Sequence, residues 1–426
     1  MNQMAIEASS MQASQLETRW HLSIIPLYMA IGSPGLLATL VALSLGANIA
    51  EIGALAAAGA LSTFVFSMVW GKLSDFSGIR KPYLLFFSVA LIPLFVGLGM
   101  ARSVAEVVLI YASASAVTAG VAPISVMYTV ECCKLQDWQV GVARYNSVTS
   151  VGNLLGLVAF TFVAPFYETR QLFYISSALC LSAALLLWRM GQEPEMTLER
   201  HPFPVRSLRD AEKLLSPRSF LHYLDLRRIK IPRSMRQLSP LQLLFLASFV
   251  HWMGISIFGV GQVPLMKELG ITDSLILALN VSTSITAAIA FAWIAPRVKP
   301  SNRGLRSIVI VRCCLILCWA AIPLLIGVDA TYLFALPLML SLAFNILYSL
   351  IWLPITNFAI AQAPADLKGS VQGELISATA LSGAVGSAIG GLLISAVGYS
   401  AGFIIAAGVA LVTIPIFNRI DIGESG

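Results

Sequence analysis

The stretch GKLSDFSGIRK, residues 71–81, is a short polar segment between two apolar runs, residues 49–71 and 82–100. Each run is close to the length of about 20 apolar residues that a helix needs to cross the hydrocarbon core of a bilayer. A long apolar run, a short polar loop and a second apolar run together predict two membrane-spanning helices joined at the membrane surface.

The same alternation extends over the rest of the chain. Hydrophobic residues make up 58% of the 426 positions and charged residues 11%, whereas a soluble domain carries about 25% charged residues. We therefore expect an all-α polytopic membrane protein with 12 transmembrane helices and no signal peptide. The expected spans are residues 20–45, 49–71, 82–100, 104–130, 144–166, 170–190, 241–266, 273–295, 307–328, 331–358, 369–396 and 399–418.

The basic residues predict the orientation of these spans, because Lys and Arg accumulate on the cytoplasmic side of a membrane. With the N-terminus inside, 24 of the 27 Lys and Arg residues fall on the cytoplasmic side, Arg312 among them, and only Arg102, Arg170 and Lys267 fall outside. A shift of the span count by one would destroy this asymmetry. The net charge of +6 then faces anionic lipid rather than nucleic acid. The protein is expected in the plasma or inner membrane, with both termini in the cytoplasm.

Two pairs of landmarks indicate an internal repeat of six helices. Gly78-Ile79-Arg80 corresponds to Gly304-Leu305-Arg306, and Gly141 to Gly369, with offsets of 226 and 228 residues. Five regions follow, the first and last of them cytoplasmic tails and the third a cytoplasmic loop. They are a tail at 1–19, a six-helix bundle at 20–190, a loop at 191–240, a second bundle at 241–418 and a tail at 419–426.

The loop at residues 71–81 resembles the signature loop of the major facilitator superfamily, written G-x-L-a-D-r-x-G-r-k. Gly71, Leu73, Asp75, Gly78 and Arg80 stand at matching positions, whereas Phe76 and Ile79 replace two usually basic residues. The resemblance implies two rocking bundles with alternating access to a central site. It also implies that the loop latches the two halves together in one state. The residues expected to form this latch are Gly71, Asp75, Gly78, Arg80 and Lys81.

The resemblance further implies that the first, fourth, seventh and tenth helices line the central cavity. Polar and aromatic residues share a helix face in these spans, and Gly32-Ser33-Pro34-Gly35 should bend the first helix near its middle. The candidates for substrate binding are Tyr28, Ser33, Tyr111, Ser115, Thr118, His251, Trp252, Gln262, Asn345, Tyr348 and Trp352. Packing between helices is an alternative role for each of them, and for the two tryptophans in particular.

Charged residues are sparse in the expected spans. No Asp or Glu stands near the middle of a span, and no Lys or Arg is expected at the midplane. The predicted cavity therefore suits a neutral or weakly charged amphiphilic solute. The candidates for proton coupling are His251, Glu131 and Glu374, since an ionisable group within a membrane is costly and is often functional. A neutral His251 hydrogen-bonded to a neighbouring helix is an equal alternative.

These features favour a secondary transporter that exports a drug-like compound, with protons as a candidate coupling ion. Uptake of a polar metabolite such as a sugar is the alternative. A membrane enzyme lacks support because the four histidines are unpaired in sequence, and ATP-driven transport lacks support because there is no phosphate-binding loop. A sensor would usually carry an added soluble domain. We expect no cofactor or metal, no nucleic acid, and a monomer in the bilayer whose partner is a small-molecule substrate.

Overall fold

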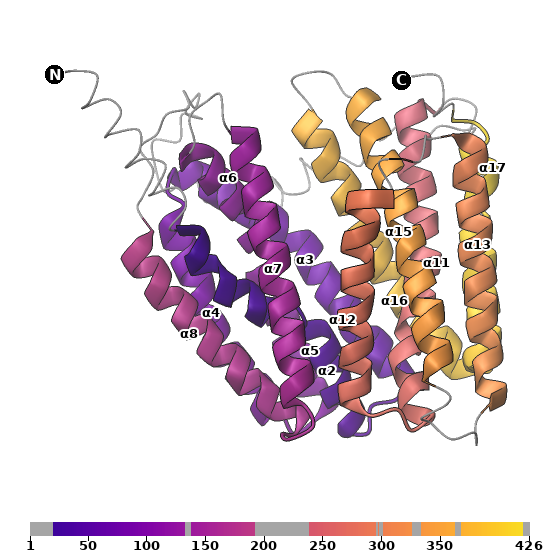
Figure 1. Cartoon of the computed structure of the whole chain (residues 1–426), viewed down its shortest axis with the longest axis horizontal. Helices are drawn as coiled ribbons and strands as arrows, with labels where there is room; N and C mark the ends of the chain where they lie inside the picture. The colour runs from indigo at the N-terminus through magenta and orange to yellow at the C-terminus, as the bar shows by residue number, and fades with distance from the viewer. Residues whose placement is uncertain are drawn as a thin grey trace, which may run out of the picture.

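A computed structural model describes residues 20–132, 138–191, 238–294, 297, 301–325, 334–362 and 368–420. The side chains at 72, 75, 76, 138–140, 143 and 368–370 are outside this description. The expected tails at 1–19 and 421–426 and most of the central loop, residues 192–237, also lie outside the described residues. Every long element in the described ranges is helical (Figure 1).

The first half is built from six membrane-crossing units. The first unit is broken at Gly32 and Ser33, as expected from the Gly-Ser-Pro-Gly sequence. The fourth is broken at Ala119 and Gly120, which the sequence analysis did not foresee. The elements are the helix of residues 20–31, α2 (Pro34–Ser44), α3 (Ile49–Ser77), α4 (Lys81–Met100), α5 (Val104–Thr118), α6 (Val121–Cys132), α7 (Trp138–Val163), η1 (Thr169–Gln171) and α8 (Leu172–Met190).

The second half repeats this plan. Its last long helix is interrupted at Gly398, whose φ of 81° and ψ of 171° are non-helical and favour glycine, and here one helix ends and the next begins. The elements are α11 (Pro240–Glu268), α12 (Asp273–Ile289), the π-helical turn η3 (Ala290–Ile294), α13 (Asn302–Ala321), η5 (Ile322–Leu325), α15 (Ala335–Gln362), α16 (Lys368–Leu411) and α17 (Thr413–Phe417).

The count of crossings follows from these helices. Within the described residues, 11 helices are long and apolar enough to cross a membrane, and the last of them, Val371–Phe417, spans 47 residues. A single crossing needs about 20 residues, so the break at Gly398 divides this helix into two. The described residues therefore form 12 transmembrane helices, six in each half, as expected.

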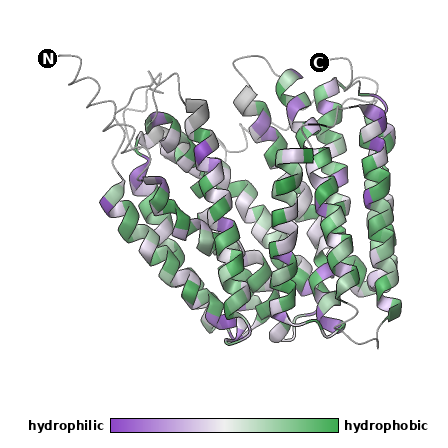
Figure 2. Ribbon diagram, viewed as in Figure 1, coloured by the Kyte–Doolittle hydropathy of each residue, from purple (hydrophilic) through white to green (hydrophobic). Residues whose placement is uncertain are grey.

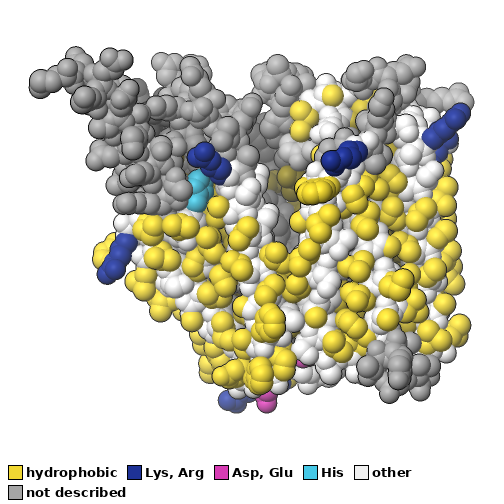
Figure 3. All heavy atoms as spheres, in the orientation of Figure 1, with side chains coloured by type: hydrophobic (Ala, Val, Ile, Leu, Met, Phe, Trp, Pro, Cys, Tyr) yellow, Lys and Arg dark blue, Asp and Glu magenta, His cyan; other side chains and the backbone are white. Residues whose placement is uncertain are grey.

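Each half has its own hydrophobic core. One core gathers Leu91, Phe95 and Phe173 of the first half, and the other gathers Phe258, Trp319 and Phe403 of the second. The outer surface is apolar as well, and large side chains such as Phe162, at 73% exposure, stand on it. On the side in view, Figure 2 shows apolar residues along the helices of both halves, and Figure 3 shows hydrophobic side chains over much of their surface. Such a surface is stable only against lipid.

The two ends of the bundle differ. We call the end with Trp20 and Ile420 the terminal face, and the end with the loop at 45–48 the opposite face. At the opposite face the halves are in contact. Gly53 of α3 packs on Gly391 of α16, so closely that a Cβ added at Gly53 would lie 2.6 Å from the Gly391 Cα.

A polar contact also joins the halves at the opposite face. The Thr169 hydroxyl of η1 donates a hydrogen bond to the Asp273 carboxylate, which opens α12. Toward the terminal face, by contrast, the helices of the two halves diverge in Figure 1, and the surface between them is hollowed in Figure 3. The molecule is therefore closed at the opposite face.

Candidate functional site

An aromatic cluster joins two helices of the second half. Trp252 of α11 meets Tyr348 and Trp352 of α15 edge to face, with ring centroids 5.5 Å and 5.8 Å apart. Tyr348 and Trp352 stand one turn apart on α15 and stack at 6.3 Å, and Phe291 of the η3 turn adds a fourth ring at 5.5 Å from Tyr348. All four rings are only partly buried. The cluster thus offers an apolar, aromatic surface of the kind that lines ligand pockets.

Arg312 lies directly behind this cluster, and here the expectation from sequence was wrong. We placed Arg312 at the cytoplasmic side because the ninth span was taken to begin at residue 307. The helix α13 in fact begins at Asn302, where Ser301 caps its first turn. Arg312 is therefore about 15 Å along the helix, deep in the bundle, and only 1% of it is exposed.

The guanidinium of Arg312 has three immediate neighbours. Its Nη1 donates a hydrogen bond to Nε2 of His251, with 2.8 Å between the nitrogens. Its Cζ lies 4.2 Å from the centroid of the Phe344 ring and 5.4 Å from that of Trp252, in the range of cation–π attraction. His251 is fully buried. The structure therefore joins His251, Trp252, Tyr348 and Trp352 in one site and adds Arg312 and Phe344, which the sequence analysis missed.

The candidates of the first half form separate groups. The hydroxyls of Tyr28 and Tyr145 lie 2.5 Å apart, which ties the first helix to α7. Tyr111 packs against Gly35, where an added Cβ would lie 2.8 Å from its hydroxyl. Thr118 donates to the carbonyl of Ser115 at 3.1 Å and so serves its own helix.

Three further candidates lie apart from the aromatic cluster or serve their own helix. The Ser33 hydroxyl is buried without a hydrogen-bond partner at the break in the first span. Gln262 is half-buried on α11, toward the opposite face. The Asn345 side chain donates to the Ser341 carbonyl at 2.9 Å, within α15.

The expected loop at residues 71–81 is mostly helical, because α3 continues to Ser77 and α4 begins at Lys81, and only residues 78–80 form a tight turn on the terminal face. Gly78 ends α3 in the left-handed conformation, φ 72°, which favours glycine. Lys81 donates to the carbonyl of Trp188 at 3.3 Å. A Cβ added at Gly71 would meet nothing within 4 Å, so Gly71 is not a close-packing position here. Asp75 lies in the last turns of α3, and its side chain is outside the described part of the structure.

Arg80 forms a buried ion pair in the same loop. Its Nη2 lies 3.2 Å from the Glu131 carboxylate at the end of α6, and its Nη1 donates to the hydroxyl of Ser74. Only 1% of Arg80 and 6% of Glu131 are exposed. The pair fastens the loop to the fourth crossing within one half. Of the other candidates for proton coupling, Glu374 is exposed on α16 and His251 accepts from Arg312.

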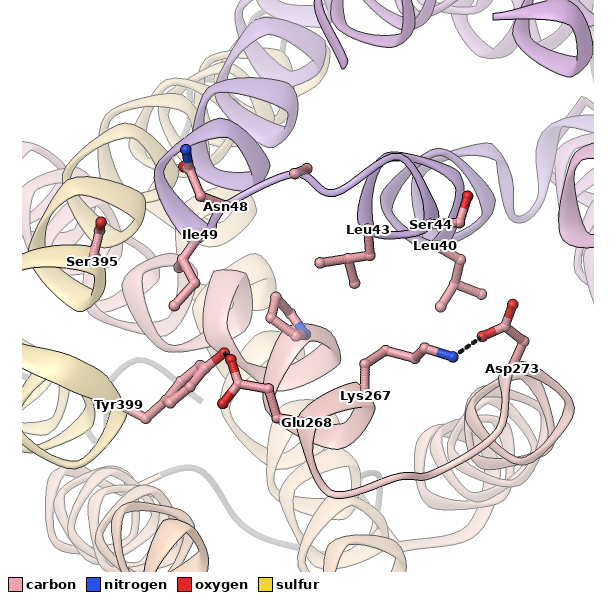
Figure 4. Close-up of a pocket in the computed structure, with 12 residues that line it drawn as sticks. Leu40, Leu43, Ser44, Asn48, Ile49, Lys267, Glu268, Asp273, Ser395 and Tyr399 are labelled. Carbon is pink, nitrogen blue, oxygen red and sulfur yellow. Dashed lines mark hydrogen bonds and ion pairs between the residues drawn. The ribbon is translucent and has the colours of Figure 1, made fainter. Parts of the chain in front are cut away.

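A pocket of about 570 Å³ opens between the halves at the opposite face (Figure 4). Lys267 and Asp273 form an ion pair of 2.6 Å on one side of it. Tyr399 donates to the Glu268 carboxylate at 2.6 Å on the other side. Residues of both halves line this pocket, which lies between them at the closed end of the molecule.

Two bundles of six crossings, in contact at one face and divergent at the other, define a membrane carrier. The sequence model of the Major Facilitator Superfamily matches residues 21–375. The chain belongs to this superfamily, and it is a transporter and not an enzyme. No curated protein matches the chain in sequence.

Solved structures share the fold. The nucleoside transporter NupG is similar with a TM-score of 0.70 and 13% identity, over 95% of this chain and 98% of that one. The human organic anion transporter MFSD10 (TETRAN) is similar with a TM-score of 0.61 and 18% identity, over 95% of this chain and 99% of that one. The D-xylose-proton symporter is similar with a TM-score of 0.68 and 13% identity, over 95% of this chain and 99% of that one. At these identities the likeness is one of fold.

Proposed function

We propose that this chain exports an amphiphilic organic solute, neutral or weakly charged, by alternating access. The observation that carries the proposal is the partly exposed cluster of Trp252, Tyr348 and Trp352 on α11 and α15. An apolar aromatic wall with a few polar groups beside it binds solutes with an apolar body. A carrier of sugars would need more amide and carboxylate side chains than this wall supplies.

In this proposal the terminal face is cytoplasmic. Support comes from the basic residues, since Arg80, Arg144 and Arg303 lie toward this face and few basic residues lie toward the other. The hollow between the halves is at the terminal face (Figure 3). The solute enters from the cytoplasm, the halves then separate near Gly53 and Gly391, and it leaves at the opposite face. The loop at residues 71–81 latches the halves at the terminal face in that second state.

Protons are the proposed coupling ion, and His251, Glu131 and Glu374 are the proposed carriers. Two of them lie beside a guanidinium, His251 beside Arg312 and Glu131 beside Arg80. A change in the charge of either group alters a buried contact, which is how protonation can bias two conformations.

Transport without ATP is the direct test of this function. An imposed proton gradient should drive the accumulation of hydrophobic dyes or drug-like compounds in liposomes that contain the purified protein. A proton ionophore should stop this accumulation. Uptake of radiolabelled solute into the vesicles is the measurement, with empty liposomes as the control. A strict need for ATP would refute the secondary-carrier proposal. Transport of sugars in place of the hydrophobic compounds would favour the alternative of metabolite uptake.

The proposed latch has its own test in Asp75→Asn. In the proposed latch the Asp75 carboxylate meets the N-terminus of another helix, where a carboxylate is worth about 1 kcal/mol, so we expect turnover to fall about fivefold while the melting temperature changes little. Transport rate and thermal unfolding should be compared with Glu106→Gln, which removes an exposed carboxylate at the opposite face. Unchanged transport in Asp75→Asn would remove this residue from the latch.

A further inference from the structure

Two arginines are fully buried in the part of the bundle that the structure describes, and their charges are balanced differently. Arg80 has the Glu131 carboxylate at 3.2 Å. Among the described residues no carboxylate lies within ion-pair distance of Arg312, and its nearest groups are one imidazole and two aromatic rings. A buried charge is stable only when it is paired or hydrogen-bonded. Arg312 is thus a buried cation whose counter-charge the described chain does not supply.

The N–H groups around Arg312 also lack hydrogen-bond acceptors. Arginine is a donor in all its N–H groups, so Nε2 of His251 must be the acceptor, and a neutral His251 then carries its proton on Nδ1. This Nδ1 is buried without a partner. Nε of Arg312 and Nε1 of Trp252 are also buried without partners. Three neighbouring side chains therefore present three N–H donors that no group in the described part of the chain accepts from.

The group that would satisfy these donors is an anion with several lone pairs. A carboxylate accepts from a guanidinium and from neutral N–H groups at once. The aromatic rings offset part of the cost of burying the charge, but a ring cannot replace an oxygen acceptor for the three N–H groups. The partly exposed rings of Tyr348 and Trp352 stand next to Trp252, so an apolar body would extend over them from the anionic group.

Trp252 lies next to both the charge and the aromatic cluster. It contacts Arg312 and both rings of α15, and it is itself only half-buried. A solute on the partly exposed cluster would therefore reach Arg312 by displacing this one side chain. The Ser248 hydroxyl, one turn away on α11 toward the terminal face, is another buried polar group without a partner.

We propose that Arg312, with His251 and Trp252, binds the anionic group of the solute, so that the substrate is an amphiphilic organic monoanion such as an aryl-alkyl carboxylate. This inference rests on the proposed export function and names the substrate class of the same site. It replaces the neutral solute with an anionic one, because Arg312 is buried in the bundle and does not lie at the membrane surface. It assigns Arg312 as the residue that selects for charge, and the aromatic cluster as the residues that select for an apolar body.

The test compares three compounds that share one apolar body: 4-phenylbutyrate, 4-phenylbutyramide and 4-phenylbutylamine. Thermal unfolding of the purified full chain should show stabilisation by the carboxylate, and little by the amide or the amine. Chloride and sulfate alone form separate arms. Stabilisation by these ions equal to that by the carboxylate would show a site for inorganic anions and overturn the proposal, as would equal or absent stabilisation across the three organic compounds.

Variants place the effect on the proposed residues. Arg312→Gln should weaken binding of 4-phenylbutyrate at least about 30-fold, because a buried charge pair is lost. Arg303→Gln, an exposed arginine at the start of the same helix, should bind normally. Trp252→Phe keeps an aromatic ring and removes one donor, so it should weaken binding about fivefold. If Arg312→Gln does not fold, the proposal is tested by the binding of the three compounds to the wild-type protein and by Trp252→Phe.

Transport of the same compounds separates this inference from the proposed function. Equal transport of amide and carboxylate, by wild type and by Arg312→Gln, would leave the exporter intact and refute the charge selection. If the carboxylate binds in a way that depends on Arg312, but the vesicles transport none of the compounds, the charge selection would stand and the proposed export would be refuted.

Discussion

Substitution of Gly53 by leucine is expected to stop transport while the protein still inserts and folds. Gly53 and Gly391 form a close backbone contact between the halves at the opposite face, and a Cβ at Gly53 would lie 2.6 Å from the Gly391 Cα and 2.7 Å from the Ser387 carbonyl. These neighbours are backbone atoms and cannot turn away. Overpacking of this kind costs about 1–3 kcal/mol. It falls only on the state in which α3 and α16 touch, so the equilibrium between states should shift about 5–150-fold.

Cysteine labelling measures this shift. Val260 of α11 is 5% exposed and packs against the core of the first half, so Val260→Cys should be protected while the opposite face is closed. In a background without the native cysteines, Gly53→Leu should raise the labelling rate of this cysteine by a membrane-impermeant maleimide at least about fivefold. Gly259→Leu is the matched control, because an added Cβ at Gly259 meets nothing within 4 Å. The same labelling rate and the same transport in Gly53→Leu and Gly259→Leu would contradict the rocking of α3 against α16.

Substitution of Glu131 by glutamine should lower the stability of the first half more than any exposed change. The variant leaves the guanidinium of Arg80 buried without the carboxylate that lies 3.2 Å away. Breaking one side of a buried ion pair costs about 3–5 kcal/mol. Other contacts of Arg80 reduce this cost, so we expect a loss near the lower figure. Thermal unfolding in detergent should therefore begin at a distinctly lower temperature in Glu131→Gln.

The control for this prediction is Glu106→Gln. Glu106 is an exposed acid in the first turn of α5, and exposed charges contribute about 0–1 kcal/mol. A melting temperature of Glu131→Gln as high as that of Glu106→Gln would show that the pair with Arg80 does not stabilise the loop. Full stability together with an altered pH dependence of transport would instead favour Glu131 as a proton carrier.

Sequence patterning was sufficient for the number of crossings, because lipid imposes one simple demand. Every backbone polar group inside the bilayer must be bonded within its own helix, so a crossing is an apolar run of fixed length and is visible in one dimension. The break at Gly32 and Ser33 and the turn at Gly78 were predictable for a similar reason, since glycine and proline act on the local backbone. The grouping of Trp252, Tyr348 and Trp352 was suggested by helical spacing, although only the structure shows that the rings touch.

The partners of charged side chains were decided by the tertiary structure alone. Arg312 looked like a residue of the membrane surface because its helix was taken to begin too late, and a shift of five residues moves a side chain by about 7.5 Å along the helix. The sequence also gave no sign that Arg80 meets Glu131, 51 residues away, or that Arg312 meets His251, 61 residues away. Apolar burial depends on the count and spacing of residues along one helix. Ion pairing depends on which helix faces become neighbours, and that is set by the packing of the whole bundle.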